Sequence, residues 1–252
     1  MTNLIGPDVS FYQDDNNTPR MIDFEQMRKQ TPYVFIRAGQ NTWTDQDLAA
    51  NMKAAKAAGL MRGTYWFYDS RVSPAKQAEL YISSLKGDLG ELPLVADFEE
   101  KYGGPYKGWK YWYDFLIELQ RLAPGKEILI YTGYYYWVEN TQGVGKASLE
   151  WFGRFGLWIA AYRVNTPRIP APWTAWTFWQ YTDKGNGLQY GAESLNIDLN
   201  YFNGDEEAFN ERFKIDTTPT PPDPQPEPTE DAIIGATVFY NSGKFVYLVP
   251  RQ

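Results

Sequence analysis

The chain has 252 residues and a formal net charge of −7, and 43% of its residues are hydrophobic, with aromatics making up 17%. This length and apolar content suffice for one barrel-sized domain with an appendage, and the negative charge argues against nucleic-acid binding through phosphate contacts. There is no Cys, which excludes disulfides and thiol chemistry, and no His, which excludes a Ser-His-Asp triad, a Cys-His pair and His-ligated zinc. Acid–base chemistry near neutral pH therefore falls to carboxylates, Tyr or Lys.

In the first half of the chain, predicted strands alternate with predicted helices. Strands are expected within residues 4–13, 33–39, 61–68 and 92–100. The first helix follows Thr44 and Asp47, which resemble a capping box, and the second begins at Ser73, an N-cap placed before Pro74. No run approaches the roughly 18 apolar residues of a membrane-spanning helix, so no membrane insertion is expected. The chain enters its first strand without the basic and apolar regions of a signal peptide, so no Sec-type export signal is expected either.

The second half of the chain is less regular. A helix is expected over about 108–122, then strands within 128–132, 157–162, 176–181 and 195–200, and a closing helix over 205–213. Only loops are expected between the sixth and seventh strands. Eight strands with helices between the early ones predict an α/β fold, a distorted (β/α)8-type barrel with missing or irregular outer helices in its second half.

The C-terminal segment has a different composition. Residues 215–230 contain six prolines, which predicts an extended linker after a barrel domain over residues 1–214. Residues 231–252 hold two β-rich runs around a Gly-containing turn, which predicts a short β-hairpin. Because a lone hairpin is marginal in water, we expect it to bind the substrate surface, to self-associate or to belong to a larger module.

One strand combines an apolar run with acids. In the segment 92–100, strand alternation places Val95, Asp97 and Glu99 on one face, with the two carboxylates roughly 7 Å apart at their Cα atoms. Glycoside hydrolysis uses such a pair, since the leaving oxygen must be protonated while positive charge builds on the sugar. The alternative interpretation is that Glu99 and Glu100 begin a polar loop after a buried strand.

Two further acids lie at predicted strand ends. Asp8 follows a Gly-Pro pair, where it is also a common turn residue, and Asp198 lies in the eighth strand. Barrel enzymes carry their chemistry at the C-terminal ends of strands, so Asp8, Asp97, Glu99 and Asp198 are expected to share one site. A Ca²⁺ or Mg²⁺ site is the alternative, but no closely spaced Asp/Asn loop is present, so neither a metal nor a cofactor is expected.

The acid–base roles follow from elementary electrostatics. Glu99 must be protonated near neutral pH, which needs a pKa raised by an apolar wall or by like charges. Asp97 is expected to stay ionised and to face the developing oxocarbenium charge. The strand spacing leaves both the retaining and the inverting outcome open.

Aromatic clusters allow two interpretations. Ring faces stack on sugar C–H faces, so the clusters at 134–137, 111–113 and 173–179 are candidates for a sugar groove, and equally for ordinary core packing. The helical spacing at 111–113 favours core for that cluster.

Seven short motifs occur in an order that resembles a known family. They are Asp8-Val9-Ser10 with Gln13, Gly63-Thr64-Tyr65, Asp97-Phe98-Glu99, Tyr131-Thr132, Trp158-Ile159-Ala160, Trp179-Gln180-Tyr181 and Ile197-Asp198-Leu199-Asn200. Over about residues 3–213 the chain resembles the family 25 glycoside hydrolases, the Chalaropsis-type lysozymes found in many phage endolysins. The proline-rich linker and the C-terminal tail also resemble an endolysin, in which a wall-binding module usually follows the catalytic domain.

The resemblance implies a muramidase that cleaves the β-1,4 bond between N-acetylmuramic acid and N-acetylglucosamine in peptidoglycan. It implies Glu99 as general acid, Asp97 as the carboxylate that assists through the substrate N-acetyl group or a water, and Asp8 and Asp198 as further acids of the pocket. The expected substrate-binding residues are Tyr65, Phe67, Tyr131, Trp158 and Gln180. Trp66 stands where relatives often have His. The resemblance also implies synthesis in a host cytoplasm and action on the wall after release.

Two rival functions remain open at this point. A non-catalytic glycan-binding module would keep the barrel and its aromatics and would bind walls without releasing reducing ends. A chitinase-like glycosidase would also carry closely spaced acids on its fourth strand.

Overall fold

The computed structural model describes residues 2–14, 18, 21–99 and 107–213, together with two C-terminal strands over 237–241 and 244–248. The chain divides into two compact units, Met1–Lys214 and Ile215–Gln252. In the second unit, β10 (Thr237–Asn241) and β11 (Lys244–Leu248) pair antiparallel as a hairpin. The predicted proline-rich linker at 215–230 lies outside the described residues.

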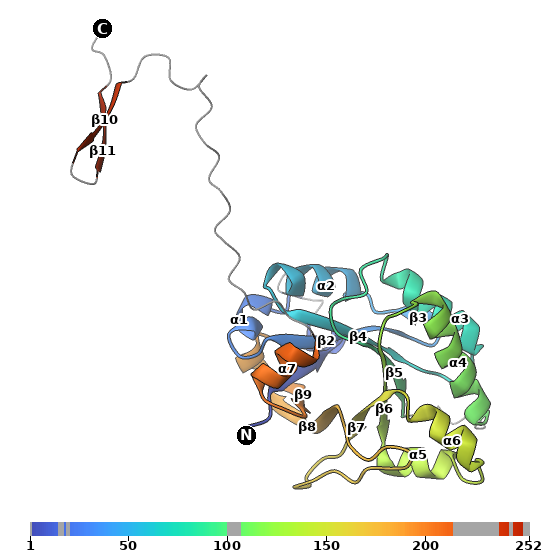
Figure 1. Ribbon diagram of the computed structural model, residues 1–252. Helices are drawn as coiled ribbons and strands as arrows, with labels where there is room; N and C mark the ends of the chain where they lie inside the picture. Colours follow the sequence, from blue (N-terminus) through green and yellow to red (C-terminus); the bar gives the residue numbers. More distant parts are fainter. Residues whose placement is uncertain are drawn as a thin grey trace. The chain divides into compact units, whose positions relative to one another are not determined.

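Eight strands of the first unit close into a barrel (Figure 1). Their order is β1-β9-β8-β7-β6-β5-β4-β2, and pairing of β1 with β2 closes the ring, while the short β3 pairs with β2 alone. The strands are β1 (Ile5–Val9), β2 (Tyr33–Gln40), β3 (Trp43–Thr44), β4 (Met61–Phe67), β5 (Leu94–Phe98), β6 (Ile128–Gly133), β7 (Gly156–Ala160), β8 (Phe178–Asn186) and β9 (Asn196–Phe202). The eight predicted strands and the distorted barrel are thus confirmed.

The direction of β9 differs from the expectation. β9 is antiparallel to both of its neighbours, β1 and β8, whereas the other barrel pairings are parallel. A parallel partner needs a crossover of a dozen or more residues, but only a short segment with the 3-10 helix Gly187–Tyr190 joins β8 to β9. The prediction that Asp198 lies at a C-terminal strand end is therefore wrong. Asp198 is the third residue of β9, and the inverted direction brings it to the same rim.

The barrel interior is filled by rings that face glycines. Phe35 lies 4.5 Å from Trp158 and 5.1 Å from Phe178 between ring centroids. Gly63 faces Phe35, and a Cβ added at Gly63 would lie 2.2 Å from Cε1 of that ring. Gly6 faces Tyr33 in the same way. Glycines thus leave room for large rings inside a narrow barrel.

Replacing Gly63 by Ala is expected to destabilise the barrel. The added methyl group overlaps a buried ring with no free space, which corresponds to overpacking by about 1–3 kcal/mol and a melting temperature lower by several degrees. Thermal unfolding followed by circular dichroism measures the change. Gly133→Ala in β6 is the control, since a Cβ there meets nothing within 4 Å. Equal melting temperatures for the two variants would contradict this account of the interior.

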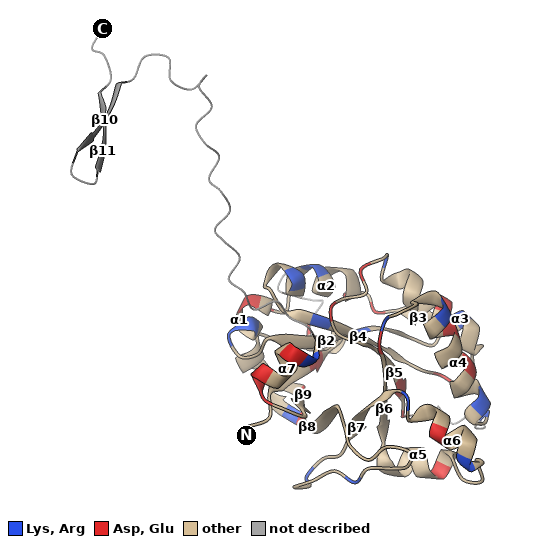
Figure 2. Ribbon diagram, viewed as in Figure 1, with Lys and Arg blue, Asp and Glu red and all other residues tan. Residues whose placement is uncertain are grey.

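Helices surround the barrel (Figure 1). They are α1 (Phe24–Arg28), α2 (Leu48–Ala57), α3 (Pro74–Ser84), α4 (Trp109–Leu122), α5 (Tyr134–Asn140), α6 (Lys146–Phe152) and α7 (Glu206–Arg212). The sequence patterns predict α2, α3, α4 and α7 but not the other three helices. Charges of both signs are interspersed over the outer helices (Figure 2), and none of the described helices is long and apolar enough to cross a membrane.

Two predicted helix caps differ from the structure. Thr44 lies in β3 rather than at a helix start, so the predicted capping box is wrong, and Asp47 occupies the N-cap of α2 without a side-chain capping bond. Ser73 does hold the N-cap position of α3 ahead of Pro74, but its hydroxyl makes no capping bond. Side-chain capping is found instead at α1, where Asp23 accepts from the Gln26 N–H, and at α7, where Asp205 accepts from the Ala208 N–H.

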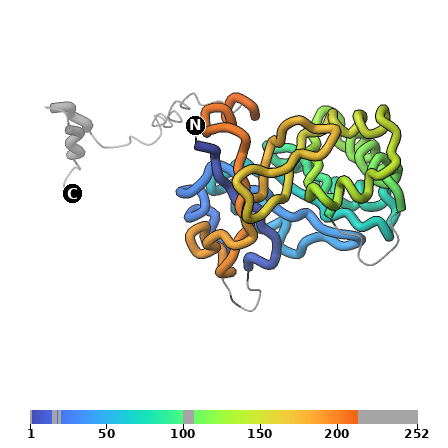
Figure 3. Tube along the Cα trace, turned by 90° about the horizontal axis from the view of Figure 1, so that it is seen from below, coloured from blue at the N-terminus to red at the C-terminus, as the bar shows by residue number. Residues whose placement is uncertain are grey.

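Helix α7 covers one end of the barrel. Phe209 stacks on Tyr33 with ring centroids 5.0 Å apart, and Phe213 lies parallel to Phe178 at 6.2 Å. Tyr33 and Phe178 are the first residues of β2 and β8, so α7 seals the N-terminal ends of the parallel strands. Figure 3 shows the barrel unit after a 90° turn from the view of Figure 1, with α7 in orange near the N-terminus. The candidate site lies at the opposite mouth of the barrel, where the parallel strands have their C-terminal ends.

Candidate active site

A cavity of about 210 Å³ opens at the C-terminal mouth of the parallel strands. Its walls include all nine residues singled out from the sequence, namely Asp8, Tyr65, Phe67, Asp97, Glu99, Tyr131, Trp158, Gln180 and Asp198. Strand alternation explains this gathering, because inward-facing residues two apart on each strand line the same space. The structure thus brings the predicted set together in one place.

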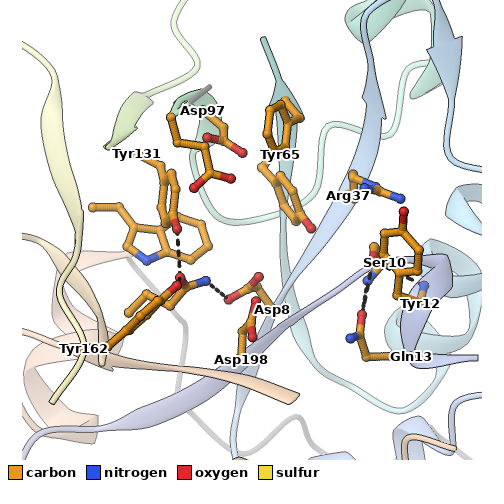
Figure 4. A pocket seen from close by; sticks show the side chains of 14 residues that line it. Asp8, Ser10, Tyr12, Gln13, Arg37, Tyr65, Asp97, Tyr131, Tyr162 and Asp198 are labelled. Atoms are coloured by element: carbon orange, nitrogen blue, oxygen red, sulfur yellow. Dashed lines mark hydrogen bonds between the residues drawn. The ribbon is translucent and has the colours of Figure 1, made fainter. Parts of the chain in front are cut away.

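The four acids come from three strands. Asp97 is the fourth residue of β5 and Glu99 follows that strand directly, so both emerge from one strand end. Asp8 of β1 and Asp198 of β9 are direct cross-strand partners in the antiparallel register. Figure 4 shows Asp8 beside Asp198, with Asp97 across the cavity between Tyr131 and Tyr65. Four carboxyls therefore share one small hollow.

Asp8 is held by a directed hydrogen-bond network. Its Oδ2 accepts hydrogen bonds from Gln180 Nε2 and Asn200 Nδ2, both at 2.8 Å. The Tyr131 hydroxyl donates to Gln180 Oε1 at 2.8 Å, and Trp158 Nε1 donates to Asn200 Oδ1 at 2.8 Å. The Tyr162 hydroxyl also donates to Gln180 Oε1. Because the tyrosine and indole donors occupy the amide oxygens, both amide nitrogens point at Asp8.

Burial and the hydrogen-bond donors shift the pKa of Asp8 in opposite directions. Burial raises the pKa of Asp8 above its ordinary value, while the hydrogen bonds from Asn200 and Gln180 lower it. Asp97 has no such donor on its Oδ1, which is buried without a hydrogen-bond partner among the described residues. Burial, then the charges of Glu99 and Asp8, raise the pKa of Asp97 well above the ordinary range. This runs against the expectation that Asp97 is the carboxylate that stays ionised.

Asp198 is also shifted toward its neutral form. Burial is the largest cause, followed by the negative charges of Asp8, Asp183 and Glu99, and together they raise the pKa of Asp198 to about 8. The shift follows from the fold, because the antiparallel pairing places Asp198 directly opposite Asp8. Near neutral pH, Asp198 is thus a hydrogen-bond donor as well as an acceptor.

Five lining residues were not predicted from the sequence: Ser10, Tyr12, Gln13, Arg37 and Tyr162. A signal for two of them exists. Strand alternation continued through Trp158 and Ala160 reaches Tyr162, and alternation through Tyr33 and Phe35 reaches Arg37, a charge in an apolar strand. Ser10 and Gln13 bond to each other in a capping box at the start of a 3-10 helix, which fixes the rim near Tyr12.

Arg37 is the basic residue of the cavity wall. Its Nε donates to Asp45 Oδ2 at 3.0 Å, and both side chains are buried. The guanidinium carbon lies 4.8 Å from the Phe11 ring centroid and 5.1 Å from those of Tyr12 and Trp43. Arg37 therefore places a positive charge and an aromatic rim on the β1–β2 side of the acids.

The structure also bears on the alternative of a metal site and on the role of the aromatic clusters. Over residues 2–14, 18, 21–99 and 107–213, no group of three or more acidic side chains is arranged to hold a metal ion. Trp112, Trp137 and Trp173 are buried in the core, so core packing is the interpretation that holds for these three rings. Tyr135 is 73% exposed and has no such role.

Comparison with known proteins gives the chain its relatives. The model of the family described as Glycosyl hydrolases family 25 matches residues 7–189. The uncharacterized protein YegX of Escherichia coli O157:H7 is 27% identical over 205 residues, covering 81% of this chain and 71% of the relative. Lysozyme M1 of Streptomyces globisporus is 29% identical over 186 residues, covering 68% of this chain and 60% of the relative.

Solved structures agree with the family match. A bacterial lysozyme from Streptomyces coelicolor has a TM-score of 0.69 and 26% identity, covering 82% of this chain and 95% of that chain. A muramidase from Trichobolus zukalii has a TM-score of 0.67 and 26% identity, covering 84% of this chain and 99% of that chain. With the family match spanning most of the barrel and both Asp97 and Glu99, the chain belongs to family 25 of the glycosyl hydrolases.

Proposed function

We propose that the protein is a muramidase that cleaves the β-1,4 bond between N-acetylmuramic acid and N-acetylglucosamine in peptidoglycan. The observation that carries the proposal is the pair Asp97 and Glu99 at one strand end, inside a cavity with two more carboxyls and aromatic walls. Relatives named lysozyme and muramidase support the wall substrate.

Glu99 is proposed as the general acid, with Asp97 as its partner. Burial and then the negative charge of Glu99 raise the pKa of Asp97, so ionisation of Glu99 makes ionisation of Asp97 less favourable. A substrate amide N–H that donates to Asp97 Oδ1 would favour the ionised form of Asp97. The shared proton would then reside on Glu99, where it is needed for the glycosidic oxygen. Substrate binding itself would thus assign the acid and the base.

Asp8 and Asp198 are proposed to act on the sugar from the opposite wall. The two amide donors on Asp8 favour its ionised form, and a fixed negative charge stabilises an oxocarbenium-like transition state. Asp198, with its pKa raised to about 8, would donate a hydrogen bond to a sugar hydroxyl. Tyr65, Phe67 and Tyr131 would supply the surfaces on which a pyranose ring packs.

The test is mass spectrometry of the products released from purified peptidoglycan. Muropeptides with N-acetylmuramic acid at the new reducing end support the proposal. A reducing end of N-acetylglucosamine would mean that the other bond is cut, and wall binding without release of reducing ends would indicate a non-catalytic module.

An endolysin role, with release onto the wall at lysis of a phage-infected host, belongs to the same proposal. It rests on the order of segments in the sequence, a barrel followed by a proline-rich stretch and a short β-hairpin. Co-sedimentation with cell walls tests the contribution of the tail. Equal retention of the full chain and of a chain ending at residue 214 would remove this argument.

A further inference from the structure

A second hollow adjoins the catalytic cavity at Tyr162. It has a volume of about 400 Å³ and is lined by residues that follow β6 and β7, namely Gly133, Tyr134, Tyr135, Tyr136, Ala160, Ala161, Tyr162, Val164, Thr166 and Arg168. Tyr162 lines both this hollow and the catalytic cavity. Because its lining begins where β6 and β7 end, the hollow opens at the same mouth of the barrel as the four acids.

The side chains of this hollow form an exposed aromatic shelf, which we define as Tyr134, Tyr135, Tyr162 and Arg168. Tyr135 is 73% exposed and Tyr162 is 40% exposed. The rings of Tyr134 and Tyr135 meet edge to face with centroids 5.2 Å apart. Tyr135 is not needed to fill the core, because Trp137 from the same helix is buried there.

Arg168 holds the shelf in place. Its guanidinium carbon lies 4.1 Å from the Tyr134 ring centroid. Its Nη2 donates to the Tyr134 hydroxyl at 2.9 Å, and its Nη1 donates to the Tyr135 hydroxyl at 3.3 Å. One side chain of the β7–β8 loop thereby fixes two rings of α5, so the rings are ordered before any ligand arrives. Such ordering lowers the entropic cost of binding.

We propose that this shelf is a distal subsite for a further sugar of the same glycan strand whose scissile bond lies in the catalytic cavity. The inference rests on the proposed function. Tyr162 lines both the cavity and the shelf, so a linear glycan that leaves the cavity on the β6–β7 side reaches the shelf next. The same glycan is therefore the expected occupant of the shelf. Tyrosine rings suit a pyranose, since they offer an apolar face for C–H groups and a hydroxyl for hydrogen bonding.

The experiment compares glycan strands of different length. We would measure kcat/KM by reducing-end release, using peptide-free strands of alternating N-acetylmuramic acid and N-acetylglucosamine, with short and long strands assayed in parallel. Tyr135→Ala and Arg168→Ala are expected to lower the ratio of kcat/KM on long to short strands by about two- to tenfold, the range that one aromatic contact provides. The loss should lie in KM rather than in kcat, because the shelf does not contact the scissile bond.

Val138→Ala is the matched control. Val138 lies on the same helix and is 39% exposed, but it does not line the hollow, so its ratio should equal that of the wild type. An unchanged ratio for Tyr135→Ala and Arg168→Ala in an active enzyme would overturn the inference alone. An effect seen only on strands that carry stem peptides would overturn it in favour of peptide binding. A wild-type protein that releases no reducing ends from any strand would instead refute the proposed function.

Discussion

Replacing Glu99 by Gln is expected to reduce glycan cleavage by about 10²- to 10⁴-fold, the range that general acid catalysis contributes. Glutamine keeps the shape of the side chain but has no proton to give to the glycosidic oxygen. Glu99 is only partly buried and follows β5 rather than lying within it, so the barrel should remain folded. Turbidity clearance of wall suspensions and reducing-end release measure the loss, and circular dichroism checks the fold.

The matched control for this variant is Glu79→Gln. Glu79 is an exposed residue of α3, outside the cavity, and the same chemical change there should leave wall lysis at the wild-type level. Wild-type clearance by the folded Glu99→Gln variant would remove Glu99 from the role of acid. Loss of activity in the Glu79 variant as well would point to a general effect of the substitution rather than to the cavity.

The acids of β5 could be predicted from the sequence because strand alternation is a local property. Once Leu92–Glu100 is recognised as a strand, the parity of Val95, Asp97 and Glu99 follows, and their inward orientation follows from the apolar partners on the other face. Leu94, Ala96 and Phe98 do pack in the layer between barrel and helices. Tyr131 and Trp158, by contrast, are expected in the wall because of the family resemblance rather than from alternation.

The direction of β9 and the electrostatics depend on tertiary structure. The length of a loop indicates whether the next strand can be parallel, but the predicted strands within 176–181 and 195–200 leave room for a crossover. The β8–β9 connection is short only because β8 extends to Asn186. The donor network on Asp8 joins residues up to 192 positions apart, so no local pattern encodes it. The pKa of Asp97 likewise depends on burial and on which donors fail to reach it, and neither can be derived from the alternation of side chains.

Replacing Asp198 by Asn is expected to stabilise the protein near neutral pH. In the folded chain the pKa of Asp198 is raised from 3.8 to about 8, whereas the unfolded chain has the ordinary value. Below about pH 4 the carboxyl is neutral in both states and carries no penalty. As the pH rises toward 8, the unfolded state ionises freely while the folded state must keep its proton, so the wild type loses stability through that window. Asparagine does not titrate and avoids the loss.

The expected gain from Asp198→Asn grows by about 2 kcal/mol between pH 4 and pH 8, or several degrees in melting temperature. This gain is smaller than the one that the whole pKa shift would imply. Asp198 is partly exposed, and part of the shift comes from its repulsion with Asp8. Urea unfolding of both proteins at each pH measures the difference. Asp114→Asn, an exposed change on α4, is the control and should show no such growth. Parallel stability curves for the wild type and Asp198→Asn would mean that the folded chain does not hold this carboxyl protonated, and the proposed donor role of Asp198 would fall with it.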